Sequence, residues 1–216
     1  MAPDTWVFSE FSEGSRYRKD SERMAALLAG LKSPYGTPYR IHRLRMRPKP
    51  GSGGEDYHAY INSFQSNGAL FFPIYGDAED EHARAIYAAA LPGHRIVGVA
   101  ALGTSWGDSV HCRTRNLLRK NTLFLFPRIE GGKIRVRALP SPGAELDGTP
   151  VVHLRVDGGE EQLIPTLPAG PFEYEALLGA RPGARLSLYV SAADTLGTRR
   201  THPRFAPEQT IEALVE

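Results

Sequence analysis

The chain has 216 residues, of which 41% are hydrophobic and 23% are charged, and its formal net charge is +2. This composition fits a globular chain with room for one large domain or two small ones. The small net charge argues neither for nor against a polyanionic partner. No stretch approaches the ~20 consecutive apolar residues that span a bilayer, and the first residues, MAPDTWVFSEF, lack the layout of a signal peptide, which taken literally predicts a cytoplasmic protein.

The first half of the chain begins with a predicted strand–helix–strand unit. Residues Thr5–Phe11 are rich in β-formers, and Asp20 or Ser21 offers an N-cap for a helix. Pro34 and Gly36 end that helix, and the alternating run Tyr39–Met46 predicts the next strand. The helix presents one apolar face, formed at the spacing i, i+3, i+4, i+7 by Met24, Leu27, Leu28 and Leu31.

The same pattern then recurs. Residues Ala69–Tyr75 form a short apolar strand, Asp77 caps a helix that ends at Pro92-Gly93, and Arg95–Ala100 is the next strand. The predicted apolar face of this helix consists of Ala83, Ile86, Tyr87 and Ala90. Two such modules leave sheet edges and helix faces open, so we interpret them as part of a larger modular α/β array.

The second half has a different texture, because the helical period vanishes from about Lys133. Short strands separated by turn residues predict a small antiparallel sandwich. These strands are Lys133–Leu139, Val151–Val156, Gln162–Leu167, Phe172–Leu178 and Leu186–Ala192. We place the linker at FPRIEGGK (126–133) and predict an α+β chain with domains at 1–128 and 129–216.

Cys112 is the only cysteine, so it cannot form an internal disulfide. A thiol attacks as the thiolate, and His111, Arg113 and Arg115 supply positive charge that favours this anion. The alternative is an inert buried thiol, although these polar neighbours are poor core material. A dyad of Cys112 with His111 is disfavoured, because adjacent residues of a strand point to opposite faces.

Three other features have structural interpretations. Asn62 precedes an apolar strand, where a turn or cap residue is expected, and DAEDEH (77–82) fits the first turn of a helix better than a metal site. The basic run YRIHRLRMRPKP (39–50) alternates as on the wet side of a strand and lacks interleaved aromatics. It therefore does not predict a nucleic-acid platform.

The segments HAYINSFQSNG (58–68) and GDSVHCRTRN (107–116) carry a family resemblance. The order Y-x-N-S, apolar strand, acidic helix start, P-G turn, strand and H-C-x-T resembles the C-terminal part of the porphyromonas-type peptidylarginine deiminase and agmatine deiminase family. The resemblance continues upstream through PYGTPYRI, and downstream LSLYVSAADTLGTRRTHP (186–203) looks like an immunoglobulin-like domain found in the peptidylarginine-acting branch.

The resemblance implies a partial pentein α/β-propeller, with about two blades in residues 1–128, followed by an immunoglobulin-like sandwich in 129–216. It implies hydrolysis of a guanidino group to a ureido group, without a cofactor or metal. Cys112 matches the family nucleophile, Asn62 matches an asparagine that lines the active site, and Asp108 is a candidate substrate-binding carboxylate. The expected partner is an arginine-containing peptide or an agmatine-like molecule, with no nucleic acid and no membrane.

This chain departs from the family pattern at the acid/base groups. The family histidine lies in an H-x-D-x-W motif, which is absent here, and the clamping aspartates belong to the same missing part. We therefore expect the chain to be inactive alone. It is interpreted as the product of a truncated gene, a chain with a miscalled start, or one half of a split enzyme, whose partner would be a separate N-terminal half. The alternatives are an agmatine deiminase-type fragment of putrescine biosynthesis, or a non-enzymatic β-sandwich that binds or anchors beside a vestigial catalytic segment. Relatives with this tail are often exported, which leaves the compartment open.

Overall fold

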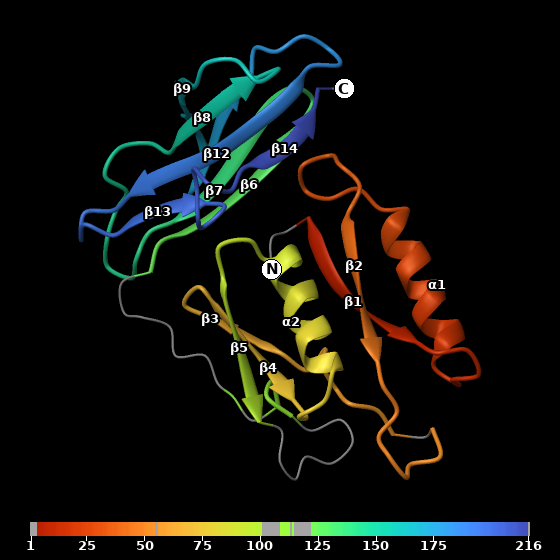
Figure 1. The fold of residues 1–216 in the computed structure, drawn as a ribbon. Coiled ribbons are helices and arrows are strands. Elements are labelled where there is room, and N and C mark those ends of the chain that lie inside the picture. The colour runs from red at the N-terminus through yellow and green to blue at the C-terminus, as the bar shows by residue number, and fades with distance from the viewer. Residues whose placement is uncertain (1–3, 55, 101–108, 113, 115–121, 216) are drawn as a thin grey trace. The chain divides into compact units, whose positions relative to one another are not determined.

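The computed structural model describes residues 4–54, 56–100, 109–112, 114 and 122–215, and Figure 1 shows their elements. The chain divides into two compact units. Unit 1 consists of Met1–Leu31 and Pro38–Asn116, and unit 2 consists of Lys32–Thr37 and Leu117–Glu216. The candidate residue Asp108 lies outside the described residues.

Unit 1 begins with a β–α–β module. Strands β1 (Thr5–Phe11) and β2 (Arg40–Met46) pair in parallel, and α1 (Arg18–Ala29) lies between them in sequence. Both predicted strands and the helix are confirmed, with β2 beginning one residue later than expected. The predicted N-cap is wrong, because α1 begins at Arg18 after Tyr17, so Asp20 and Ser21 lie inside the helix. A parallel pair needs such a crossover, because its two strands run in the same direction.

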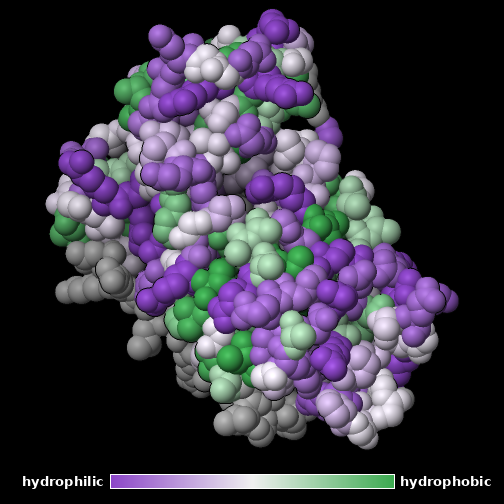
Figure 2. Space-filling view, in the orientation of Figure 1, coloured by the Kyte–Doolittle hydropathy of each residue, from purple (hydrophilic) through white to green (hydrophobic). Residues whose placement is uncertain are grey.

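The apolar face predicted for α1 is wrong. The residues that α1 buries are Ser21 and Ala25, whereas Met24 and Leu27 are 43% and 58% exposed. The Ser21 hydroxyl donates a 2.6 Å hydrogen bond to the carbonyl of Ser9 in β1, and the small Ala25 lies one turn further along the same face. This bond fixes the rotation of α1 and turns the leucine stripe outward, where Figure 2 shows apolar side chains scattered among hydrophilic ones.

The second module of unit 1 is a three-stranded sheet with one helix. Its strands are β3 (Phe64–Ser66), β4 (Ala69–Ile74) and β5 (Arg95–Ala100), in the order β3-β4-β5, and its helix is α2 (Glu79–Ala90). The short strand β3 was missed, although the Asn67-Gly68 pair that turns it into β4, with positive φ at both residues, is a hairpin signal. The predicted face of α2 is confirmed for its three buried members, Ala83, Tyr87 and Ala90.

Helix α2 joins the two small sheets of unit 1 into one core. It contacts both β2 and β5, and Figure 1 shows it between the two sheets. The buried cluster takes residues from each module: Val7, Leu44, Tyr60, Leu70, Phe72, Ala83, Tyr87, Ala90 and Leu91. Across the described part of the chain, neither helix has the length and apolar character needed to cross a bilayer.

Unit 2 consists of two antiparallel sheets that share one core. One sheet has the order β10-β11-β7-β6, and the other has the order β13-β12-β8-β9, with β14 also paired to β12. The strands are β6 (Phe124–Glu130), β7 (Lys133–Leu139), β8 (Val151–Val156), β9 (Gln162–Pro165), β10 (Leu167–Gly170), β11 (Glu173–Leu177), β12 (Arg185–Ala193), β13 (Arg199–His202) and β14 (Ile211–Leu214). All five predicted strand regions are strands, and one of them, 162–167, is divided between β9 and β10.

The predicted linker at 126–133 is wrong, because these residues form a hairpin. Strands β6 and β7 pair along their whole length, and Gly131-Gly132 turns between them with positive φ. Two adjacent glycines favour such a tight turn as readily as a flexible connection, so composition alone misassigned it. Strand β6 belongs to unit 2, which therefore begins before residue 129. The kinds of domain expected in each half stay predictions.

A short segment from the first half of the chain also belongs to unit 2. Tyr35 is 2% exposed within the core of unit 2, and its hydroxyl lies 2.7 Å from Nε2 of His202. The amide of Ile129 donates a 3.0 Å hydrogen bond to the carbonyl of Pro34. The chain therefore enters unit 2 after α1, returns to unit 1 at Pro38 and enters unit 2 again after Asn116.

Candidate functional site

The side chains of Asn62 and Cys112 meet in unit 1. Nδ2 of Asn62 donates to Sγ of Cys112 at 3.3 Å, and Oδ1 of Asn62 accepts a 2.8 Å hydrogen bond from the backbone amide of His111. Asn62 thus binds the segment beside the cysteine with one amide atom and contacts the sulfur with the other. Two of the residues selected from the sequence are brought together, although their roles in a reaction stay predictions.

The threonine of H-C-x-T closes the turn that carries the cysteine. Oγ1 of Thr114 donates to the carbonyl of Val110 at 2.8 Å, and the amide of Thr114 lies 3.3 Å from the carbonyl of His111. A hydroxyl that bonds a carbonyl three or four residues earlier stabilises a compact turn. The motif therefore encodes a local fold that holds Cys112 against Asn62.

Cys112 is exposed, as a nucleophile must be if a substrate is to reach it. The N–H of Asn62 Nδ2 is directed at this exposed sulfur. The contact between His111 and Asn62 uses the backbone amide of His111. The role of the His111 side chain stays a prediction.

A pocket of about 420 Å³ adjoins this site. Its wall includes Asn62, which contacts Cys112, and His111, which directly precedes Cys112. The rest of the wall is mainly apolar. Three aromatic rings pack on one another in it, with ring centres 5.0 Å apart for Phe11 and Tyr57 and 5.5 Å apart for Phe11 and Tyr17. The full lining is Phe11, Tyr17, Met46, Tyr57, Ala59, Ile61, Asn62, Ser63 and His111. No periodic signal marks this set, because its members come from separate strands and loops.

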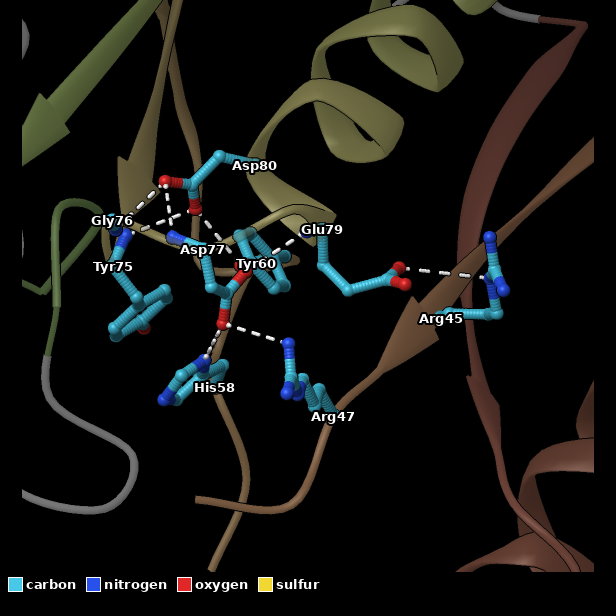
Figure 3. A network of polar contacts seen from close by, with 9 residues as sticks. All are labelled: Arg45, Arg47, His58, Tyr60, Tyr75, Gly76, Asp77, Glu79 and Asp80. Atoms are coloured by element: carbon cyan, nitrogen blue, oxygen red, sulfur yellow. Dashed lines mark hydrogen bonds and ion pairs between the residues drawn. The ribbon is translucent and has the colours of Figure 1, made fainter. Parts of the chain in front are cut away.

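A buried acidic network anchors the segment that carries Asn62 (Figure 3). The hydroxyl of Tyr60 lies 2.8 Å from Oδ1 of both Asp77 and Asp80. Asp80 also accepts hydrogen bonds from the amides of Tyr75 and Gly76, at 2.9 and 2.8 Å, so it secures the loop before α2. Tyr60 is fully buried and lies two residues before Asn62, so its bonds restrict where Asn62 can lie.

His58 and Tyr75 extend this anchor. Their rings stack with centres 4.0 Å apart, and the hydroxyl of Tyr75 accepts a 2.8 Å hydrogen bond from the amide of Ala59. Burial lowers the pKa of His58, and the nearby Asp77, with Oδ2 3.2 Å from Nδ1, opposes that shift only in part. His58 is therefore favoured as a neutral ring, which suits a packing residue better than a cation.

Asp77 is held as an anion by several donors. Burial alone would raise its pKa, but hydrogen bonds from Tyr60 and from the amide of Glu79, together with the charge of Arg47, lower the pKa overall. Burial, together with the carboxylates of Asp77 and Asp80, raises the pKa of Tyr60. The carboxylates of DAEDEH thus bind donors of the protein itself, as a helix start requires.

The basic run of β2 meets acids of α2 and its preceding loop. Arg47 lies 3.5 Å from Asp77, and Arg45 lies 3.6 Å from Glu79, both shown in Figure 3. Arg43 bonds the carboxylate of Glu22 on α1. These arginines link the helices of unit 1 to β2, which is the wet-strand role that their alternation predicted.

Comparison with known proteins places this site in a family. A family model described as "Porphyromonas-type peptidyl-arginine deiminase" matches residues 1–117, which include Asn62 and Cys112. A protein of Listeria monocytogenes named "Putative agmatine deiminase 2" is 35% identical over 69 residues, which is 30% of this chain and 18% of that protein. The chain therefore spans less than a fifth of the length of this relative.

Two solved structures are also similar to part of the chain. The "Putative Arginine Deiminase from Porphyromonas gingivalis" is 27% identical, with a TM-score of 0.40, over 50% of this chain and 32% of its own. The agmatine deiminase of Enterococcus faecalis is 21% identical, with a TM-score of 0.44, over 51% of this chain and 36% of its own. Since the family model matches more than half of the chain, the chain belongs to the Porphyromonas-type peptidyl-arginine deiminase family.

Proposed function

We propose that this chain supplies the nucleophile-bearing part of an enzyme that hydrolyses the guanidino group of peptidyl-arginine to a ureido group and ammonia. The observation that carries the proposal is the 3.3 Å contact between Nδ2 of Asn62 and Sγ of Cys112, which joins the two motifs of the family resemblance. Membership in the family supplies the reaction class.

The chemistry assigns a role to each of the two residues. The Cys112 thiolate attacks the guanidinium carbon, forming an S–C bond, and a protonated amino group then leaves as ammonia. Water adds to the resulting amidino thioether, and the S–C bond breaks to return the thiolate and release the ureido product. Asn62 stabilises the sulfur anion at the start and at the end of this cycle.

The reaction also requires carboxylates that bind the guanidinium and a general acid and base. A guanidinium stays protonated at physiological pH and presents a planar fork of N–H donors, which carboxylates bind best. Proton transfer to the leaving ammonia and from the water calls for a general acid and base. None of the described residues that line the adjoining pocket is Asp or Glu. We propose that another polypeptide segment, such as a separate N-terminal half, contributes them.

An assay of ureido product tests this proposal. The recombinant chain alone is expected to give no more product from peptidyl-arginine or agmatine than its Cys112→Ala variant. The same chain, tagged after Glu216 and purified from its own cells with whatever polypeptide completes the site, is expected to turn over peptidyl-arginine in a Cys112-dependent way. Native material without Cys112-dependent product would contradict the proposed function, and turnover by the chain alone would contradict its incompleteness.

The proposal gives unit 2 no part in the reaction, so its role is considered separately. The family match ends at residue 117, so the likeness of the second half to an immunoglobulin-like domain is a proposal too. It is supported by two antiparallel sheets around one core. Such a unit folds on its own hydrophobic cluster and can serve as an attached binding or anchoring module.

A further inference from the structure

We infer that the aromatic pocket beside Cys112 is a subsite for an apolar side chain that neighbours arginine in a peptide, and that it disfavours agmatine. This inference rests on the proposed function and names the substrate class that the same site would select. We call the pocket, defined by its nine lining residues from Phe11 to His111, the aromatic pocket.

The aromatic pocket adjoins the thiol site through Asn62 and His111. Asn62 lines the pocket and donates to Sγ of Cys112 at 3.3 Å, and His111 lines it directly before the cysteine. A molecule whose reacting carbon meets the sulfur therefore has its adjoining groups at the mouth of the pocket. The volume, about 420 Å³, falls within the ~300–1,000 Å³ range of small-ligand pockets.

The wall of the aromatic pocket is built to receive apolar groups. Tyr57 and Met46 are 5% and 7% exposed, so their positions are fixed by the surrounding unit. Phe11 meets Tyr57 edge to face, and Tyr17 also packs edge to face on Tyr57, with ring centres 5.9 Å apart. Rings already packed in such pairs form a stiff apolar surface that needs little reordering when a ligand binds.

The same wall is poorly suited to a cation. None of its described lining residues is Asp or Glu, so an ammonium that entered would lose its hydration without gaining an ionic partner.

These properties separate the two candidate substrates. Agmatine carries a second cation, its primary ammonium, at the end opposite the guanidino group. Peptidyl-arginine presents a neutral backbone there, together with the side chains of its neighbours in the peptide. The pocket therefore favours a peptide in which an aromatic or large aliphatic residue adjoins the arginine.

Three Cys112-directed probes test the inference on the full chain. Each is an N-substituted 2-chloroacetamidine, with a phenylethyl, a butyl or a 4-ammoniobutyl tail. The sulfur of Cys112 forms an S–C bond as the C–Cl bond breaks, chloride leaves and the thiol proton passes to solvent. The rate of labelling, kinact/KI, is measured by mass spectrometry of the Cys112 peptide, so no turnover is needed.

We expect the phenylethyl probe to label saturably and about tenfold faster than the ammoniobutyl probe, with the butyl probe between them. Ala59→Leu fills the pocket and should reduce the phenylethyl rate to the ammoniobutyl rate, which itself stays unchanged. Ala88→Leu, on the exposed side of α2, is the matched control and should leave all three rates as they were. Ile61→Phe fills the same pocket and replaces Ala59→Leu if that variant loses its circular dichroism spectrum.

Equal rates for the three tails would overturn the inference, as would a filled-pocket variant that keeps its fold and slows all three probes equally. The outcome is independent of the deiminase proposal. Tail selectivity without any Cys112-dependent ureido product from native material would refute the proposed function and keep the pocket. Cys112-dependent product without tail selectivity would keep the function and refute the subsite.

Discussion

Nδ2 of Asn62 lies 3.3 Å from Sγ of Cys112, although 50 residues separate the two in the sequence. The segment that carries Asn62 is held by Tyr60, and the turn that carries Cys112 is closed by Thr114. The contact therefore depends on two local structures, each fixed by its own hydrogen bonds.

Replacing Asn62 by Asp should slow alkylation of Cys112. The aspartate keeps an oxygen for the amide of His111 but loses the N–H donor to sulfur and adds a negative charge that opposes the thiolate. We expect the rate with iodoacetamide at neutral pH to fall about fivefold, which corresponds to ~1 kcal/mol. Asn67→Asp adds the same charge at the β3–β4 turn and should leave the rate unchanged. An unaltered rate in Asn62→Asp would mean that the amide does not act on the sulfur.

Replacing Tyr60 by Phe should destabilise unit 1. The hydroxyl is buried between Asp77 and Asp80, and its loss leaves both carboxylates with one donor fewer. We expect the free energy of unfolding to fall by about 1–3 kcal/mol.

Urea unfolding followed by tryptophan fluorescence measures this effect, because the two tryptophans, Trp6 and Trp106, both fall within the residue ranges of unit 1. Tyr39→Phe is the matched control at a partly exposed tyrosine, where we expect a change within about 0.5 kcal/mol. Equal effects of the two substitutions would show that the acidic network contributes nothing to the stability of unit 1.

The exposed face of α1 gives a prediction opposite to the one made from its sequence. Leu27→Lys should change the stability of unit 1 by no more than about 0.5 kcal/mol, because Leu27 is exposed. Ala25→Leu should destabilise it by about 1–3 kcal/mol, because the larger side chain must enter the contact with β1. Thermal melts of the two variants measure both effects, and a reversed order would restore the leucine stripe as the buried face.

Unit 2 should lose stability in acid through Asp194. Hydrogen bonds from the hydroxyl of Ser141 and from the amides of Thr198 and Ser141 outweigh burial and lower the pKa of Asp194 to about 2 from its ordinary 3.8. Since the folded-state pKa is the lower one, this stabilisation is present above pH 4 and is lost as the pH falls towards 2.

Urea unfolding of unit 2 by far-ultraviolet circular dichroism at pH 5 and pH 2 checks this sign. Asp194→Asn should be less stable than the parent at pH 5 and should show a smaller drop on acidification. Asp147→Asn, at an exposed aspartate of the same unit, should behave as the parent does. A parent protein with equal stability at the two pH values would contradict the assignment.

Periodicity predicted α2 and most of the strands, because each of these buries alternate or one-sided residues against a neighbouring core. It missed β3, β6, β13 and β14. It failed for α1, where the bond of Ser21 to Ser9 fixes the rotation of the helix instead of its leucines. Composition also misplaced the linker at Gly131-Gly132, and nothing local marks Tyr35 as a member of unit 2. These outcomes depend on partners far away in the sequence.

The candidate site, too, could be predicted from the sequence only in part. The motifs around Asn62 and Cys112 are visible in the sequence, and a family resemblance connects them, but their bond exists only in the fold. No sequence pattern marks the aromatic pocket. Phe11 ends β1, Met46 ends β2 and Tyr57 follows β2, so these lining residues share no regular spacing in the sequence. The third candidate, Asp108, lies outside the described residues, so its role in binding substrate stays a prediction.

Trapping the reaction intermediate tests the central claim most directly. Protein purified from its own cells through a tag after Glu216 is mixed with a peptidyl-arginine substrate, quenched in acid within one turnover and digested for mass spectrometry. We predict an adduct on the Cys112 peptide with the mass of the substrate less ammonia, and none in Cys112→Ala. Ureido product that forms without such an adduct and persists in Cys112→Ala would contradict the account.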